Sequence, residues 1–472
     1  MDEDTTIIEK TETNQSANET QIEEELDEPN GTTTMEMEEE EETTREGDDT
    51  QLEERQKEIE VAPALIAVHP CGDSVVVAVG LELRVFDLRA NSSVLVGDVS
   101  KEQLHKDSIR AVRFSEGGKL LVSAGDDKLV KIWQAGTWLC LGSLDSDKRV
   151  SAVAISKDEQ FVCFADKFGV VWAVSLKELN QHTALSNEKP VPILSHYCSI
   201  ITSLEFSPDG RYIVSADRDS KIRVTVFPKN HLAGAHEIQS FCLGHSEYVS
   251  CLVFVQSSDQ CQSYLLSGSG DSTVRLWDFL SGSLLCTCNV GAKAGLSMES
   301  HPAVTDLCVS RDGSLVAVAT QGFQGVLLLS CNLSAKSLSV VKVVSFPGEA
   351  FVPTKLASGS SAGLLWMVSG VSSLAGAKAS CLARVKVASG FKRTAEDSHE
   401  DELTLLDDSE IPGGEKLLQK LQGSVRVESN LLSAAADAVR AAMSKLLIKK
   451  QYTVEKRDFR KRRRNDRKFK KP

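Results

Sequence analysis

The 472-residue chain has few of the features that mark secreted, membrane-spanning or metal-binding proteins. Its N-terminus is acidic and has no apolar run, so we expect no signal peptide. No apolar segment is long enough to cross a bilayer. The twelve cysteines are dispersed, and the nine histidines show no metal-ligand spacing with them. These absences predict free, mostly buried thiols in a reducing compartment, and therefore a cytosolic or nuclear protein.

Catalytic motifs are also scarce. The stretch "GSGDST" is glycine-rich, but no helix pattern follows it, so we interpret it as a turn and not as a phosphate-binding loop. No strand-turn-helix unit suited to a nucleotide or S-adenosylmethionine pocket occurs before Gly390. No Ser-His-Asp arrangement survives once the repeat residues described below are assigned to structure. We therefore predict a binding or scaffolding protein, with no catalytic, cofactor or metal site in this chain.

The net charge of −14 is distributed unevenly. Residues 1–60 are rich in Asp, Glu and Thr and nearly free of aromatic residues, so they cannot bury enough apolar area to offset chain entropy. We expect this segment to be a disordered acidic tail. From Lys445 to Pro472 the sign reverses, with fourteen Lys or Arg against three acidic residues.

Two segments in the middle of the chain share one spacing of polar and aromatic residues. In each, a histidine precedes a phenylalanine by nine residues, a serine follows, an aspartate comes four residues after the serine, and a tryptophan six residues later. The eight residues are His105, Ser123, Asp127, Trp133, His245, Ser267, Asp271 and Trp277. Each segment alternates apolar and polar residues between turn-forming clusters, as short antiparallel strands do.

This pattern resembles the WD repeat, which builds β-propellers with four strands per blade. Weaker copies bring the total to seven units over residues 61–390, so we expect an all-β, seven-bladed WD-repeat β-propeller. The eight residues above match the hydrogen-bonded tetrads of that family. Such a tetrad satisfies buried polar groups that would otherwise cost about 1–3 kcal/mol each. We therefore assign these residues to structure and not to catalysis.

The composition changes after Gly390. Residues 391–414 are polar and acidic and are predicted to be a linker. Residues 415–450 place apolar side chains at spacings near 3.6 residues, which predicts a helix. Residues 451–472 form a basic tail. The C-terminal extension is thus expected to be helical and then basic.

One repeat departs from the template at "SADRDSKIRVT", Ser215 to Thr225. The template places Ser215 at the tetrad serine and Asp219 at the tetrad aspartate, which predicts a structural role for both. Thr225 stands where the tryptophan belongs. Five charges fall within Asp217 to Arg223. This blade therefore lacks its bulky tryptophan and carries unusual charge.

Strand periodicity separates the side chains of this stretch into two faces. Ile222 and Val224 share one face, which should be packed, whereas Lys221, Arg223 and Thr225 share the other. A solvated turn would explain such charges, but neighbouring repeats carry fewer of them. The missing tryptophan also leaves room for another group to pack.

Together with "SFCLGHSEYVS", the stretch resembles the non-catalytic WD-repeat subunit of the eukaryotic tRNA (guanine-N7)-methyltransferase. The resemblance implies a heterodimer with a separate catalytic subunit, which uses S-adenosylmethionine to form 7-methylguanosine in the tRNA variable loop. It implies no cofactor in this chain and contact with tRNA through the complex. The partner-binding residues carried over from that family are Asp217, Arg218, Asp219, Lys221 and Arg223.

The basic tail resembles a nuclear-import signal, which predicts a nuclear location. Clustered cations also contact RNA phosphates, so the same segment is a candidate RNA-binding element. The residues concerned are Lys461, Arg462, Arg463, Arg464, Arg467 and Lys468.

Two other functions stay open. Substrate receptors of cullin-type ubiquitin ligases often carry W-D-x-R at the end of a blade. Here Trp277-Asp278 is followed by Phe279 and Leu280, but "FDLR" (residues 86–89) is a weak variant. A generic nucleolar scaffold, with the basic tail as its nucleic-acid element, is the third possibility.

Overall fold

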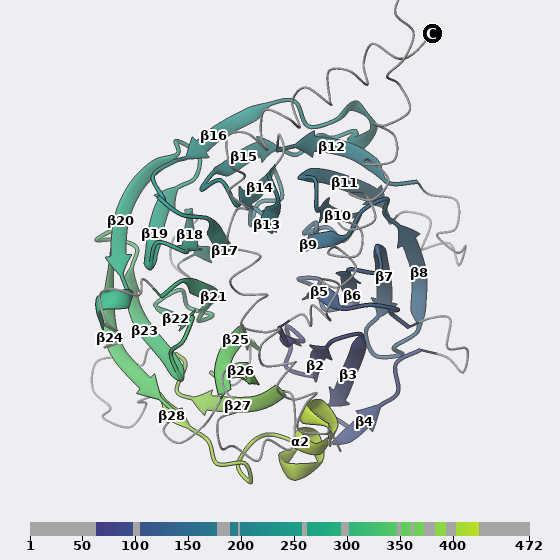
Figure 1. Ribbon diagram of the computed structural model, residues 1–472, viewed down its shortest axis with the longest axis vertical. Coiled ribbons are helices and arrows are strands. Elements are labelled where there is room, and N and C mark those ends of the chain that lie inside the picture. Colours follow the sequence, from purple (N-terminus) through teal and green to yellow (C-terminus); the bar gives the residue numbers. More distant parts are fainter. Residues whose placement is uncertain are drawn as a thin grey trace, which may run out of the picture. The chain divides into compact units, whose positions relative to one another are not determined.

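The computed structural model describes residues 63–97, 104–176, 189–196, 199–256, 262–293, 302–346, 351–359, 363–371, 383–392 and 403–423. The chain divides into two units, Met1–Glu58 and Ile59–Pro472, and all the described residues belong to the second. They form seven four-stranded antiparallel sheets, each made of four strands consecutive in the sequence. The sheets are the blades of a ring, with the first strand of each toward the centre (Figure 1). The predicted seven-bladed propeller is confirmed.

Blades 1 to 4 contain the first sixteen strands. Blade 1 has β1 (Leu65–Val68), β2 (Ser74–Val79), β3 (Glu82–Asp87) and β4 (Ser92–Val94). Blade 2 has β5 (Ile109–Phe114), β6 (Leu120–Gly125), β7 (Leu129–Gln134) and β8 (Cys140–Asp145). Blade 3 has β9 (Val150–Ile155), β10 (Phe161–Asp166), β11 (Val170–Ser175) and β12 (Val191–Ser195). Blade 4 has β13 (Ile201–Phe206), β14 (Tyr212–Asp217), β15 (Ile222–Val226) and β16 (Ile238–Cys242).

Blades 5 to 7 complete the ring. Blade 5 has β17 (Val249–Gln256), β18 (Ser263–Ser269), β19 (Thr273–Asp278) and β20 (Ser283–Asn289). Blade 6 has β21 (Val304–Val309), β22 (Leu315–Thr320), β23 (Gly325–Asn332) and β24 (Ser337–Ser345). Blade 7 has β25 (Phe351–Ser358), β26 (Leu365–Val371), β27 (Ala383–Ser389) and β28 (Thr404–Leu405). Two 3-10 turns, η4 (His231–Ala233) and η5 (Gly291–Lys293), and the helix α2 (Gly414–Gln422) are the other elements.

The second strands of the blades are buried on both faces. In β10 and β22, five consecutive residues are buried, where simple alternation would leave every second residue exposed. The reason is that each blade is packed between two others, so neither face of its sheet meets water. Val274 of blade 5 and Val318 of blade 6, for example, belong to one buried cluster.

The innermost strands close the ring. They contact one another in chain order from β1 to β25, and β25 contacts β1 again. At this junction the Thr354 hydroxyl donates to the carbonyl of Ala64, at 2.8 Å. Closure leaves each sheet with only its outermost edge open to solvent.

The helix α2 covers the junction between the last blade and the first. It packs on β3 and β4 of blade 1 and on β27 of blade 7. Its buried Leu417 and Leu421 share a cluster with Phe86. Arg84 Nη1 donates to the carbonyls of Leu421 and Gln422, at 3.1 and 2.6 Å. These carbonyls lie at the helix C-terminus, where no intrahelical donor reaches them.

Two differences from the sequence-based organisation concern residues after 390. The segment 391–414, expected to be a linker, supplies β28, which pairs with β27 as the outer strand of blade 7. The predicted helix 415–450 is observed as α2, one residue earlier at its start and ending at Gln422. Residues 424–450, the acidic tail 1–60 and the basic tail 451–472 lie outside the described residues.

Candidate partner-binding surface

The two tetrads expected from the repeat spacing are present in blades 2 and 5. In blade 2, His105 Nδ1 donates to Asp127 at 2.7 Å, and the Ser123 hydroxyl lies 2.7 Å from His105 Nε2. Trp133 Nε1 donates to the same hydroxyl at 2.8 Å. In blade 5, His245 Nδ1 lies 2.9 Å from Asp271, and His245 Nε2 lies 2.7 Å from the Ser267 hydroxyl. Trp277 Nε1 donates to that hydroxyl at 2.8 Å. In each tetrad the polar side-chain atoms hydrogen-bond to one another inside one blade, so these residues have a structural role.

Blade 4 forms a variant tetrad around a different aspartate from the one the spacing predicts. His196 Nδ1 lies 2.9 Å from Asp217, and His196 Nε2 lies 2.7 Å from Ser215 Oγ. The prediction for Ser215 is therefore confirmed, whereas the assignment of Asp219 as the tetrad residue was wrong. Asp217 ends β14 and reaches the histidine directly, while Asp219 lies in the following turn. The spacing rule also missed His196, because it precedes its phenylalanine by ten residues and not nine.

This geometry also corrects the predicted role of Asp217 in partner binding. Asp217 is only 1% exposed, and its carboxylate accepts the backbone N–H groups of Asp219 and Lys221 at 2.9 and 3.0 Å. A carboxylate that is buried and already bonded to three other residues cannot also lie on an open surface. Asp217 therefore shapes the turn that carries the neighbouring charges.

The tetrad carboxylates have lowered pKa values. Burial raises the pKa of Asp127, Asp217 and Asp271, but hydrogen bonds from the paired histidine and from backbone amides outweigh it. Each net pKa is below the usual 3.8. The ionised form of each carboxylate is thus the one that the fold stabilises.

Arg223 lies half-buried on β15, at the boundary with blade 3. Its Nε donates to the Thr225 hydroxyl at 3.2 Å, and its Nη1 donates to the carbonyl of Ser195 on β12 at 3.1 Å. Burial lowers the pKa of Arg223, and no described carboxylate offsets that cost. Thr225 is fully buried, and its hydrogen bond with Arg223 places the two residues on one face of the strand, as the periodicity predicts. In place of the tryptophan, this threonine orients a guanidinium.

Exposed apolar side chains stand opposite the cations of this strand. Phe241 on β16 pairs with Arg223, and cross-strand partners point to the same side of a sheet. Continuing the register places Leu243 beside Lys221. Phe241 is 43% exposed and Leu243 60% exposed. We call these four residues the blade-4 edge patch.

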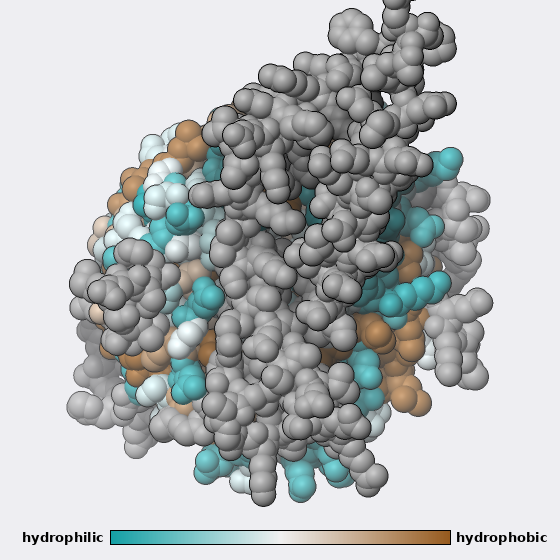
Figure 2. Space-filling view, viewed as in Figure 1, coloured by the Kyte–Doolittle hydropathy of each residue, from teal (hydrophilic) through white to brown (hydrophobic). Residues whose placement is uncertain are grey.

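Further apolar residues extend this surface along the rim of the ring. Ile238, Leu280 and Leu284 are all at least 40% exposed, and Gln239 Nε2 joins β16 to the carbonyl of Leu280 at 3.1 Å. Figure 2 shows hydrophobic surface along the rim between β16 and β20. Exposed apolar surface beside cations that no described carboxylate neutralises is typical of a site for another protein. The sequence analysis missed its apolar half, although "SFCLG" carries the alternation that signals it.

The remaining charges of the stretch are placed differently. Lys221 is exposed and Asp219 is half-buried in the turn before β15. Arg218, in the same turn, lines a cavity in the central channel. The structure therefore brings Lys221 and Arg223 together at the blade edge but separates Arg218 from them.

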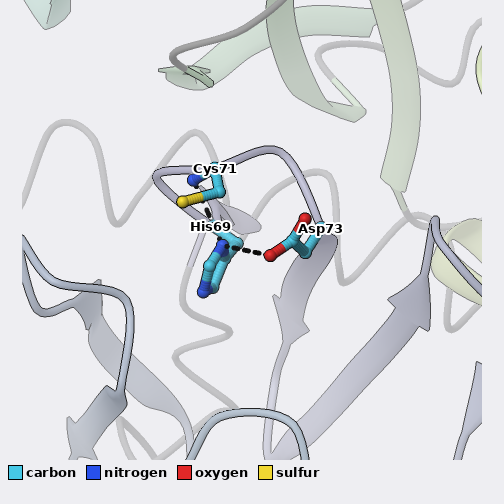
Figure 3. Close-up of side chains that lie close together, drawn as sticks. All are labelled: His69, Cys71 and Asp73. Atoms are coloured by element: carbon cyan, nitrogen blue, oxygen red, sulfur yellow. Dashed lines mark hydrogen bonds and ion pairs between the residues drawn. The ribbon is translucent and has the colours of Figure 1, made fainter.

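A cluster of three potential metal ligands lies in the turn between β1 and β2. The ligand atoms of His69, Cys71 and Asp73 are within 4.8 Å of one another (Figure 3). Both ring nitrogens of His69 are engaged, however. Nδ1 accepts the Cys71 backbone N–H at 3.2 Å, and Nε2 donates to the Gly118 carbonyl of blade 2 at 2.9 Å. Asp73 is paired with Arg89, so these residues tie two blades together instead of forming a metal site.

Other predicted features have definite places. "GSGDST" is the turn between β18 and β19 within blade 5, as interpreted from sequence. In "FDLR", Phe86 is buried, and the exposed Arg89 makes the ion pair with Asp73.

The nine cysteines among the described residues are free thiols. In the described part of the chain, the one α-helix is too short and too polar to serve as a membrane span. The six basic residues from Lys461 to Lys468 lie outside it.

Comparison with known proteins points to one family. The family model described as "tRNA methyltransferase TRM82 WD40 domain" matches residues 4–196 and 189–372. Three relatives are each called a tRNA (guanine-N(7)-)-methyltransferase non-catalytic subunit. The one from Dictyostelium discoideum is 31% identical over 249 residues, covering 50% of both chains. The one from Danio rerio is 34% identical over 241 residues, covering 50% of this chain and 54% of the relative.

The third relative, from Mus musculus, is 34% identical over 227 residues, covering 48% of this chain and 49% of the relative. The chain thus spans about half the length of the curated relatives it matches. Among solved structures, the RRP9 WD40 repeats align with a TM-score of 0.54 at 20% identity, covering 66% of this chain and 87% of that one. The Cps50 (Swd1) β-propeller aligns with a TM-score of 0.51 at 13% identity, covering 65% of this chain and 92% of that one. These structural likenesses show the fold alone.

Proposed function

Because this chain belongs to the family described as the tRNA methyltransferase TRM82 WD40 domain, we propose that it is the non-catalytic subunit of a tRNA (guanine-N7)-methyltransferase. The names of its relatives support this proposal over a ubiquitin-ligase receptor or a generic nucleolar scaffold. In this function the chain binds a separate catalytic subunit as a heterodimer. The complex then forms 7-methylguanosine in the variable loop of tRNA.

The observation that carries the proposal is the blade-4 edge patch. Lys221 and Arg223 place two cations beside the exposed Phe241 and Leu243. Such a surface fits a partner that presents carboxylates next to apolar side chains. A guanidinium can make paired hydrogen bonds to one carboxylate and an ammonium cannot, so Arg223 is the main anchor. The contacts to Thr225 and Ser195 hold it in one orientation before the partner arrives.

The methyl donor S-adenosylmethionine would be bound by the partner. The described residues of this chain are antiparallel blades and one short helix, and they contain no strand-turn-helix unit of the kind that holds such a group. The contribution of this chain is therefore to binding. By holding the catalytic subunit in a competent conformation, it raises the fraction of that subunit able to react.

The basic tail adds two parts to the proposal. Lys461 to Lys468 would direct import into the nucleus and would contact tRNA phosphates in the complex. Deleting residues 456–472 should move the protein out of the nucleus and weaken tRNA binding, with the remaining affinity less dependent on salt. Unchanged localisation and unchanged tRNA affinity would contradict both parts.

Affinity purification from nuclear extract tests the proposed function. We expect a small methyltransferase to co-purify with the chain, and the captured complex to transfer methyl groups from S-adenosylmethionine to a guanine of tRNA. Recovery of a cullin adaptor or of ribosome-assembly factors without a methyltransferase would contradict the proposal. Arg223→Glu should lose the methyltransferase from the purified complex. Arg211→Glu is the matched control and should retain it, because Arg211 is an exposed arginine of the same blade that pairs with Asp209 and lies outside the edge patch.

A further inference from the structure

The central channel contains a cavity at the end where the inner strands begin. Its volume is about 390 Å³, and all seven blades contribute to its wall. The wall includes the first residues of several inner strands, among them Leu65, Ile109 and Ile201. A volume of this size lies in the range of small-molecule sites, about 300–1,000 Å³.

Cations gather on one side of this cavity. Arg110 comes from blade 2, Arg149 and Lys167 from blade 3, and Arg218 from blade 4. One carboxylate, that of Asp126, faces these cations. Its Oδ2 lies 2.6 Å from Arg110 Nη2, and its Oδ1 lies 4.0 Å from Arg149 Nη1. The four cations therefore outnumber the carboxylate on this wall.

Two polar groups of the wall have unmet hydrogen-bonding capacity. Arg218 Nη2 and Thr305 Oγ1 are buried atoms that have no hydrogen-bond partner among the described residues. They belong to blades 4 and 6, so they face the cavity from different sides. Burial lowers the pKa of Arg218, and Asp219 offsets this only by its charge. A buried donor without a partner is costly, so these atoms point to a missing acceptor.

Ion pairs limit the depth of the cavity. Lys355 Nζ lies 2.6 Å from Asp306, and the next charges along the inner strands are Arg113 on β5 and Glu205 on β13. Arg113 and Glu205 pair although their blades are not neighbours, so the pair spans the channel wall in front of β9. A ligand is therefore confined to the mouth, where the four cations gather.

We propose that this cavity binds a small organic anion that carries more than one phosphate group. Two or more phosphates match cations that separate blades contribute to the wall, such as Lys167 of blade 3 and Arg218 of blade 4. Phosphate oxygens would accept from the guanidinium of Arg218 and from the Thr305 hydroxyl. The apolar part of the wall, formed by residues such as Val304 and Pro63, suits an organic body attached to the phosphates.

Calorimetric titration of the full chain with pyrophosphate and with tripolyphosphate tests this proposal. We expect binding that weakens as salt rises, and weakening of about tenfold or more in Arg218→Gln and in Lys167→Gln. Lys167 is exposed, so its variant folds normally and keeps the test valid if Arg218→Gln is unstable. Arg211→Gln, in the same blade but outside the cavity, should bind as the parent does.

Equal affinity of Arg218→Gln, Lys167→Gln and the control would overturn the proposal. So would a glutamate-rich peptide that binds the parent more tightly than tripolyphosphate and loses affinity in the same variants, since the site would then serve an acidic peptide. The titration uses the chain alone and does not depend on the proposed methyltransferase partner.

Discussion

At the residue scale, blade 4 shows how one aspartate can serve a turn and a tetrad together. Asp217 accepts two backbone amides through one oxygen and lies against His196 through the other. This arrangement replaces the tryptophan-containing tetrad of blades 2 and 5. It also fixes the turn that carries Arg218 and Lys221, so a buried structural residue positions two candidate binding residues.

Replacing Asp217 with alanine should destabilise the propeller. The change leaves His196 and two turn amides without their acceptor, which should lower the free energy of unfolding by about 1–3 kcal/mol. Asp219→Ala is the matched control, because Asp219 is the neighbouring carboxylate in the turn and is not the acceptor for His196. Urea denaturation of both variants measures the difference. Equal losses would contradict the assignment of Asp217 to the tetrad.

The tetrad carboxylates also predict the pH dependence of stability. Because the folded-state pKa values of Asp127, Asp217 and Asp271 are lowered, their stabilising contribution is complete above the unfolded pKa, about 3.9. It is lost as pH falls through the folded values. Unfolding free energies measured from pH 7 down to pH 3 should therefore decrease below about pH 4. Asp217→Asn should show a shallower decrease, and an identical slope would speak against its lowered pKa.

Arg223 is expected to decide partner affinity. Arg223→Glu should abolish association with the catalytic subunit, because a buried charge pair that is broken costs on the order of 2–5 kcal/mol. Co-purification measures association, and thermal melting checks that the blade still folds. Arg223→Gln, which keeps a donor for Ser195, is the milder test if Arg223→Glu unfolds. Normal partner binding by a folded Arg223 variant would show that the interface lies elsewhere.

At the element scale, α2 acts as a clasp on the ring. Among the described strands, every blade consists of four that are consecutive in the sequence, so no strand of the first blade completes the last. The junction between blades 7 and 1 depends on the contact of β25 with β1 and on the helix that covers both blades. Burial of Leu417 and Leu421 in a cluster of both blades gives this helix its stabilising role.

Truncating one buried side chain of α2 should destabilise the whole propeller. Leu417→Ala leaves a cavity at a fully buried position, so we expect a loss of about 2–5 kcal/mol in unfolding free energy. Lys416→Ala, at an exposed position of the same helix, should have little effect. Calorimetric melting compares the two variants. If Leu417→Ala melts as the parent does, the helix is not needed for closure.

At the scale of the whole molecule, the ring presents two separate surfaces from one blade. The edge patch faces outward with Lys221 and Arg223, and the channel cavity receives Arg218 from the same turn. We expect the purified chain to show no methyltransferase activity by itself and to support activity once the catalytic subunit is added. Transfer of radiolabelled methyl groups to tRNA measures this. Methylation by the chain alone, or calorimetric binding of S-adenosylmethionine to it, would contradict the proposed function.

The sequence by itself determined the repeat, the number of blades and the two tryptophan-containing tetrads, because these depend on local spacing and strand periodicity. It also suggested Arg223 as a candidate partner-binding residue, because the run of charges and the missing tryptophan both lie within one short stretch. Only the tertiary structure decided that Asp217 and not Asp219 contacts His196, because the partner lies across a loop of variable length. It also placed Phe241 beside Arg223, Arg218 in the channel and α2 across the ring junction. These relations join residues from different strands or blades, and their distances follow from closing the ring, which no local spacing encodes.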